Sequence, residues 1–197
     1  MRGLQPDATI RASGTRVSEA PALRIANRHV SAVVCLPDAE RGYYRSTRFD
    51  WGGVVRDLRS GGHRYVSEWQ PRHDPLRHDG LTGPADEFTQ IGYERARPGQ
   101  EFLKIGVGTL RKFSDHPYDR FRLYEIADPG IWETTAERDR VEFRHRLLTD
   151  EYGYDYRKTL RLTDAPGLRI EYTLKNLGPA PLTGHVYNHN FFTLDRI

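Results

Sequence analysis

Residues that could transfer protons gather near the end of this chain, in the run YNHNF at positions 187–191. An imidazole has an unperturbed pKa of roughly 6.5, so His189 could give and regain a proton near neutral pH. Strand side chains alternate between two faces, which predicts one face shared by His185, Tyr187, His189 and Phe191. These four side chains are therefore candidates for a site, with His189 able to transfer protons and His185 and Tyr187 able to bind substrate. The alternative is that His185 and Tyr187 are hydrogen-bonded core or rim residues.

A second group of candidates lies in the segment Glu68–Gly92, which is rich in Pro, Gly, His and acids and is predicted to be a loop without core-forming residues. Long loops on rigid β scaffolds are where binding groups concentrate. His78 is a candidate catalytic residue here, and Asp86 and Glu87 are candidates for binding hydroxyl groups. Acids that follow a Gly-Pro turn can equally be solvated or capping groups. Arg48, in a predicted strand, could hold a substrate oxygen with its fork of donors, or be an ordinary surface arginine.

Metal and thiol chemistry receive little support from residue spacing. A site built from His73, His78, His189 and Asp79 is conceivable, but no tight ligand spacing indicates one, so we predict neither a metal nor a cofactor. The single cysteine, Cys35, lies in the apolar run SAVVCLP and is interpreted as a small buried hydrophobe, with a reactive thiol as the alternative.

The elements that must position these residues are predicted to be strands. No segment has helical periodicity of useful length, whereas residues 168–175 alternate between apolar and polar as a half-buried strand does. Strand-type runs between turn signals cover residues 23–36, 43–58, 64–69, 101–113, 122–127, 141–148, 154–162, 168–177 and 182–194. We predict a mobile tail over residues 1–21 and one domain over residues 22–197, an all-β, large antiparallel β-sandwich.

Charge and hydropathy argue against two classes of partner. The net charge of +3 and pI near 9.0 come from basic residues interleaved with acids, as in residues 133–146 (ETTAERDRVEFRHR). That pattern is typical of a solvated face, so no nucleic-acid partner is predicted. No stretch approaches the roughly 20 apolar residues of a membrane helix, so no membrane partner is predicted and the expected location is cytoplasmic.

Two segments, in order, resemble the galactose mutarotase (aldose 1-epimerase) family. The run HDGLTG at 78–83 is similar to the family's His-Gly-Gly-x-x-Gly loop, and YNHNFFTL at 187–194 is similar to its Asn-His-x-Tyr-Phe-Asn-Leu strand. Supporting similarities are WGGVVRDL at 51–58 and IEYTLKN at 170–176. Asp79 replaces a family glycine, and Asn190-Phe191-Phe192 replaces a Thr-Tyr-Phe type run. The resemblance covers Leu23 to Leu194, and these departures indicate a divergent branch.

The resemblance implies a galactose mutarotase-like supersandwich that interconverts the α and β anomers of a small-molecule sugar. It assigns the general acid to His189 and the second, substrate-oriented histidine to His78. The family's general-base glutamate follows the histidine strand by a long interval, and no position of this chain matches it. The chain is therefore expected either to lack a C-terminal part beyond Ile197, which the end within a strand-like run favours, or to be a degenerate member that binds without turnover. The competing functions are a noncatalytic carbohydrate-binding domain of a larger carbohydrate-processing protein and a purely structural sandwich. The sequence predicts neither the sugar nor an oligomeric state.

Overall fold

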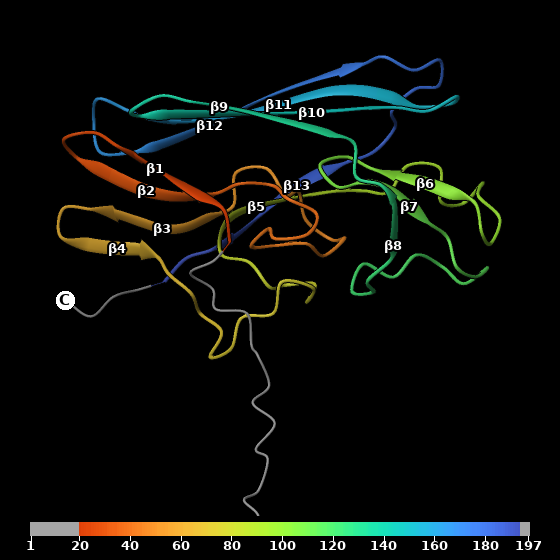
Figure 1. The fold of residues 1–197 in the computed structure, drawn as a ribbon, viewed down its shortest axis with the longest axis horizontal. Coiled ribbons are helices and arrows are strands. Elements are labelled where there is room, and N and C mark those ends of the chain that lie inside the picture. Colours follow the sequence, from red (N-terminus) through yellow and green to blue (C-terminus); the bar gives the residue numbers. More distant parts are fainter. Residues whose placement is uncertain (1–19, 194–197) are drawn as a thin grey trace, which may run out of the picture.

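The computed structural model describes residues 20–193, so the tail predicted over residues 1–21 lies almost wholly outside the described residues. The described chain contains thirteen strands and no helix, and every strand pairing is antiparallel. This confirms the prediction of an all-β antiparallel fold. The strands form four sheets, which are arranged as the two layers of a sandwich (Figure 1).

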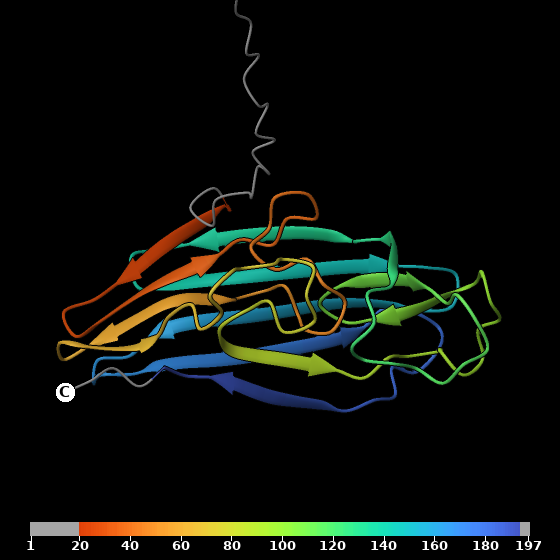
Figure 2. The same ribbon diagram turned by 90° about the horizontal axis from the view of Figure 1, so that it is seen from below.

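One layer is a four-stranded sheet with long central strands. In spatial order its strands are β12 (Leu168–Asn176), β11 (Gly153–Leu162), β10 (Arg140–Leu148) and β9 (Ile131–Ala136). Alternate residues of β10 and most alternate residues of β11 are buried, because one face of the sheet packs on the other layer. Figures 1 and 2 show this sheet extending along most of the length of the molecule.

The facing layer contains three smaller sheets. The first has β1 (Ala22–Ala26), β2 (Val30–Cys35), β3 (Val55–Ser60) and β4 (His63–Val66). Next to it lies the pair of β5 (Gly83–Phe88) and β13 (Val186–Phe191), with β13 at the margin of the molecule (Figure 2). The third, at one end, has β6 (Glu101–Lys104), β7 (Gly108–Arg111) and β8 (Glu125–Asp128) (Figure 1).

Glycine is required where β5 begins beside β3. Gly83 has a φ of +80°, a conformation that side chains disfavour. A Cβ at this position would lie 2.7 Å from the carbonyl oxygen of Val55, so a larger residue would push β5 away from β3.

Apolar clusters lie on both sides of the facing layer. Between the layers, side chains of β1 to β4 pack on those of β10 and β11: Ile25, Val30, Ala32, Val34, Val55, Val66, Val141, Phe143, Leu160 and Leu162. On the outer side, irregular segments cover a second cluster that includes Phe49, Trp51, Leu81 and Ala85. Full burial of a valine, leucine, isoleucine or phenylalanine side chain stabilises the fold by about 1.5–3 kcal/mol. Cys35 belongs to the outer cluster, as predicted, and burial raises the pKa of its thiol to about 12.

Three expectations about local structure were wrong. The segment Glu68–Gly92 is not all loop, because β5 lies within it and five of its six residues are buried. The run at 43–58 becomes a strand only from Val55, and Arg48 lies in an irregular segment. β9 was missed because its sequence IWETTA is exposed at five of six positions and lacks strand alternation. In β5, partners from distant segments make burial of two acids possible, which local sequence does not reveal.

Candidate functional site

The two acidic residues of β5 point to opposite faces of their sheet. In the antiparallel register, Glu87 faces Tyr187 and Asp86 faces Asn188. Side chains alternate along each strand, so Glu87 and Tyr187 share a face with His189, while Asp86 and Asn188 point the other way. Both carboxylates are buried, with 4% of Glu87 and none of Asp86 exposed, so neither is the solvated acid that the Gly-Pro turn alternatively suggested.

Glu87 is the centre of a polar cluster on the outer face, here named the outer network and comprising Arg48, His78, Glu87, Arg120 and Tyr187. The Arg48 Nε donates to Glu87 Oε2 at 2.9 Å, and its Nη2 donates to the Tyr187 hydroxyl at 2.9 Å. The Tyr187 hydroxyl in turn donates to Glu87 Oε2 at 2.8 Å. Arg120 reaches Glu87 Oε1 at 3.6 Å. Four of these five residues were predicted from the sequence, and Arg120 was not.

His78 lies at the edge of the outer network, 3.4 Å from Arg48 Nη1 through its Nδ1. A guanidinium can only donate, so a hydrogen bond here makes Nδ1 the acceptor. A neutral His78 then carries its proton on Nε2, which remains a donor. Its ring also packs edge-on against Phe121, with centroids 4.9 Å apart.

His189 adjoins the outer network and is surrounded by aromatic rings. Its ring lies 4.2 Å from Phe191 and 6.1 Å from Phe49, centroid to centroid, and Phe49 also lies 4.5 Å from the Arg48 guanidinium. Burial lowers the pKa of His189, and the charge of Arg48 lowers it further against the opposing effect of Glu87. Near pH 7 His189 is therefore a neutral imidazole. Among the described residues its Nδ1 is buried without a hydrogen-bond partner.

A buried lysine close to the outer network was also not predicted from the sequence. Lys104, at the end of β6, is 1% exposed, and its ammonium donates to the carbonyl of Phe88. Burial is the main cause that lowers its pKa to about 8; Arg120 and Arg48 lower it as well, and Glu87 opposes them. No alternation could have identified Lys104, because Phe102, Leu103 and Ile105 around it are all buried.

Asp86 belongs to a second cluster between the two layers, here named the inner network and comprising Asp50, Asp86, Tyr156, Lys158 and Tyr172. Lys158 Nζ lies 2.6 Å from Asp86 Oδ2 and 3.2 Å from Asp50 Oδ2. Burial alone lowers the pKa of Lys158, but the two carboxylates outweigh it and the net shift is upward. Burial raises the pKa of Asp50, against the opposing charge of Lys158.

Neutral groups complete the inner network. The Tyr156 hydroxyl donates to Asp50 at 2.9 Å, and the Tyr172 hydroxyl lies 3.0 Å from each oxygen of Asp86. The Asn188 amide also donates to Asp86. Asp86 was predicted to bind substrate together with Glu87, but the structure places it on the opposite face with its oxygens occupied. Strand alternation identifies Lys158 as facing the core, since Tyr154, Tyr156, Leu160 and Leu162 of the same strand are buried.

His185 lies apart from both networks. It is exposed just before β13, and its backbone N–H donates to Thr89 Oγ1 at 2.9 Å. It borders an apolar cavity of about 120 Å³, which is also lined by Phe88, Ile91, Ile105, Leu174, Leu182 and Val186. Phe88 is on the face of β5 that Asp86 occupies, so the structure does not bring His185 together with Tyr187 and His189.

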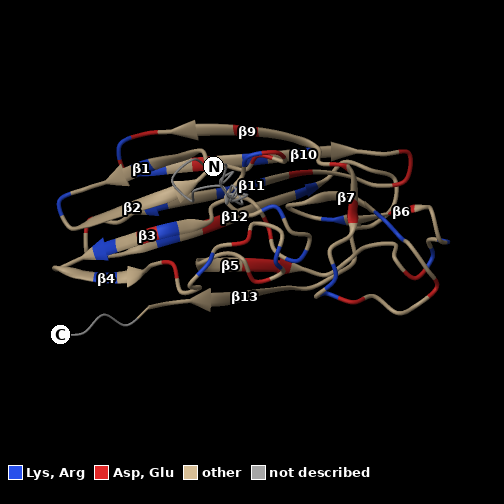
Figure 3. Cartoon of the chain, turned by 60° about the horizontal axis from the view of Figure 1, so that its bottom comes forward, with Lys and Arg blue, Asp and Glu red and all other residues tan. Residues whose placement is uncertain are grey.

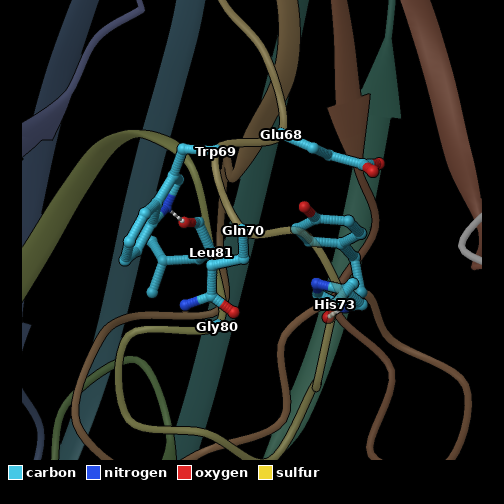
Figure 4. Close-up of a pocket in the computed structure, with 7 residues that line it drawn as sticks. Glu68, Trp69, Gln70, His73, Gly80 and Leu81 are labelled. Carbon is cyan, nitrogen blue, oxygen red and sulfur yellow. Dashed lines mark hydrogen bonds between the residues drawn. The ribbon is translucent and has the colours of Figure 1, made fainter.

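His73, one of the histidines considered for a metal site, has other partners. Figure 4 shows His73 in a cavity beside Glu68, Trp69 and Gln70, with a volume of about 10 Å³, roughly the space of one water. The His73 ring stacks on Tyr43 at 4.1 Å, and its Nε2 lies 2.8 Å from the Tyr43 carbonyl oxygen. Within residues 20–193, no group of three or more His, Cys, Asp or Glu side chains could hold a metal ion.

Basic and acidic side chains interleave in space as they do in the sequence. Figure 3 shows blue and red segments alternating along strands and loops, with a continuous acidic segment in β5. That segment is Asp86 and Glu87, whose charges are compensated by the inner and outer networks. None of the described residues form a helix long and apolar enough to cross a bilayer.

Comparison of the chain with protein families, curated proteins and solved structures found no match.

Proposed function

We propose that the outer network binds a sugar and that His189 transfers protons during interconversion of its anomers. The observation that carries this proposal is the placement of fixed donors and an acceptor beside aromatic rings. Arg48, Glu87 and Tyr187 form hydrogen bonds of 2.8–2.9 Å, next to the rings of Phe49 and Phe121. Sugars combine hydroxyl groups with apolar C–H faces, and this arrangement provides partners for both. The resemblance of residues 78–83 and 187–194 to the mutarotase family supports the same function.

The outer network can meet a ligand at its solvent-facing side. Arg48 and Glu87 are buried, whereas Tyr187 is 41% exposed and Phe121 is 57% exposed. In our proposal the Phe121 ring stacks on a C–H face of the sugar, and the Nε2–H of His78 donates to a sugar oxygen. The buried Arg48–Glu87 pair holds the Tyr187 hydroxyl in place, which reduces the conformational entropy lost on binding.

Anomer exchange requires the C1 hydroxyl to lose a proton while the C1–ring oxygen bond breaks. Neutral His189 takes that proton, C1 becomes a carbonyl, and the ring oxygen gains a proton from water. In ring closure the protonated His189 returns its proton to the former carbonyl oxygen, and the hydroxyl that re-forms the ring gives its proton to the hydroxide left by water. This proposal makes His189 the base of ring opening, which differs from the general acid that the resemblance implies. The lowered pKa of His189 favours this order near pH 7, because the imidazole starts the cycle as an acceptor. Its unpaired, buried Nδ1 also supports a ligand nearby.

A second candidate function is sugar binding without turnover. It is favoured by the state of Glu87, whose carboxylate accepts from Arg48 and Tyr187 and also faces Arg120. Both carboxylate oxygens of Glu87 face guanidinium groups, so Glu87 is not assigned as the general base of a mutarotase. Whether the site interconverts anomers or only binds the sugar therefore depends on His189.

The test measures binding and anomer exchange by the full 197-residue chain. Titration of glucose, galactose and mannose, followed by NMR of the histidine ring protons, is expected to shift His78 and His189 together. Polarimetry is expected to show faster mutarotation, and His189→Ala should lower the rate by about 100-fold. His185→Ala is the matched control, since His185 lies near the same strand but outside the outer network. Binding without faster mutarotation would establish the noncatalytic function, and the absence of binding for every sugar would refute both.

A further inference from the structure

Positive charge exceeds negative charge around the outer network. Glu87 forms ion pairs with Arg48 and Arg120 and also interacts electrostatically with Lys104. The other charged groups that shift the pKa of Lys104 are the two arginines. Arg48 and Glu87 neutralise one another through a buried ion pair of 2.9 Å. Arg120 remains as a permanent positive charge, and Lys104 adds a second below a pH of about 8. A buried or partly buried excess of one sign is costly unless a ligand compensates it.

The two arginines differ in how firmly they are held. The Arg48 side chain is 10% exposed and makes two hydrogen bonds of 2.9 Å. The Arg120 side chain is 47% exposed, and its contacts to Glu87 Oε1 and the Tyr187 hydroxyl are 3.6 Å and 3.5 Å. Contacts of this length are weak, so Arg120 can turn its guanidinium to an incoming group at little cost. Arg48 is a fixed part of the site, whereas Arg120 is available to a ligand.

We infer that the sugar bound by the outer network carries a carboxylate, which the Arg120 guanidinium receives at the solvent-facing edge of the site. This inference rests on the proposed function and adds the substrate class, a sugar acid of the hexuronate type. A carboxylate presents two oxygens in one plane, which matches the fork of a guanidinium. Arg48 and Glu87 cancel, and the buried Lys104 donates to the carbonyl of Phe88, so Arg120 is the surplus cation that a ligand can contact. The one charge of a carboxylate neutralises Arg120, whereas a phosphate monoester, with a charge of about −1.5 to −2 at pH 7, exceeds the charge of Arg120.

The neighbours of Arg120 fit the rest of such a ligand. The Arg120 guanidinium lies 5.9 Å from the centre of the Tyr187 ring, and Phe121 follows directly in the chain. A carboxylate bound to Arg120 therefore places the attached sugar ring beside Tyr187 and Phe121, whose exposed faces can receive its C–H groups.

The test is calorimetric titration of the full chain with sugar pairs that differ only at C6: glucose with glucuronate, galactose with galacturonate and mannose with mannuronate. Glucose 6-phosphate is the fourth acidic probe. For at least one pair we expect the uronate to bind about 10-fold more tightly than the neutral sugar, and more tightly than the phosphate. Arg120→Gln should reduce that preference to less than about 2-fold.

Arg122→Gln is the matched control, because Arg122 is an exposed arginine of the same segment that packs on Phe113 instead. It should keep the full preference for the uronate. Equal binding of both members of every pair, a preference for the phosphate, or a preference that survives Arg120→Gln would overturn the inference and leave the proposed sugar site intact. Failure of all these sugars to bind would refute the proposed function itself.

Discussion

Asp86 and Glu87 are neighbours in β5 but belong to different networks. The two networks differ in how far their polar groups are buried and paired with one another. In the inner network, Lys158 lies between two carboxylates that also receive hydrogen bonds from Tyr156 and Tyr172. Its charged groups are shielded from solvent, and its donors are matched by acceptors. In the outer network, Glu87 is buried but Tyr187, Arg120 and Phe121 reach solvent.

We interpret the difference as separating a structural role from the proposed ligand-binding role. A closed network of buried charges gives a ligand no group to contact, and disrupting it lowers the stability of the fold. An open network with surplus cations retains donors that a ligand can use. The pKa values of two buried lysines shift in opposite directions: downward for Lys104, which adjoins the outer network, and upward for Lys158 in the inner network. Four predictions examine this division, in order of decreasing effect.

The largest effect is expected from removing the cation of the inner network. Lys158→Met leaves Asp50 and Asp86 buried without their counter-charge, which should lower the free energy of unfolding by about 3–5 kcal/mol. Urea denaturation measures the change, and Lys175→Met on the exposed side of β12 is the control. A loss below about 1 kcal/mol would show that the inner network does not depend on its ion pairs.

A second prediction concerns the pH dependence that the two lysines confer. The folded-state pKa of Lys104 is about 8 against roughly 10.5 unfolded, so the unfolded chain binds more protons between these values. Stability should then rise with pH across this window, by at most about 3 kcal/mol from Lys104. The raised pKa of Lys158 contributes no rise there.

The measurement for Lys104 is urea denaturation of the wild type and Lys104→Met at pH 7.5, 9 and 10. Other groups titrate in this range, so the informative quantity is the difference between the two proteins. We expect the stability advantage of Lys104→Met to shrink as the pH rises. A difference that is constant with pH would mean that Lys104 has an ordinary pKa in the folded protein.

A third prediction separates stability from binding in the outer network. Arg48→Gln leaves Glu87 with a weaker partner and should cost about 1–3 kcal/mol of stability, while sugar affinity falls by at least about 10-fold. The double variant Arg48→Gln/Glu87→Gln should recover most of the stability, because neither member of the buried ion pair is left unpaired, yet not the affinity. Recovery of sugar binding in the double variant would contradict a role for the ion pair in the site.

The smallest effect is expected from two tyrosine hydroxyls. Tyr172→Phe removes a donor from Asp86 in the closed network and should cost about 1 kcal/mol. Tyr187→Phe removes a donor to Glu87, which keeps its contacts with Arg48 and Arg120, and should change stability by less than about 0.5 kcal/mol. The two hydroxyls differ in their acceptors and not in exposure, since Tyr172 is 44% and Tyr187 41% exposed. Thermal or urea unfolding measures the stability change in both variants. A larger loss for Tyr187→Phe than for Tyr172→Phe would contradict the description of the inner network as closed and the outer network as open.

Part of the site was predictable, because strand alternation is local. The YNHNF run predicts that Tyr187 and His189 share a face, and the structure shows them on the same face of β13. Alternation in β11 equally indicates that Lys158 faces the core with Tyr156 and Leu160, although this signal was overlooked. The prediction that His185 shares this face was wrong, because the strand begins only at Val186 and alternation does not extend to His185.

Contacts between distant segments were not predictable. Arg48 and Glu87 are separated by 39 residues and Lys158 and Asp50 by 108, so no local pattern joins them. Arg120 lies in an irregular segment with no periodicity, and its place beside Glu87 depends on how that segment folds over β5 and β13. The assignment of β5 as a loop failed for the same reason.

By itself the sequence determined that the chain folds as antiparallel strands, because a two-residue period of apolar side chains buries one face of a strand and no helical period competes with it. It also determined which chemical groups β5 and β13 carry. Only the tertiary structure decided which of them meet. Asp86 and Glu87 are adjacent acids after the same turn, and the sequence treats them alike. The pleat sends one toward Lys158 and the other toward Arg48, so that one stabilises the core and the other faces the candidate site.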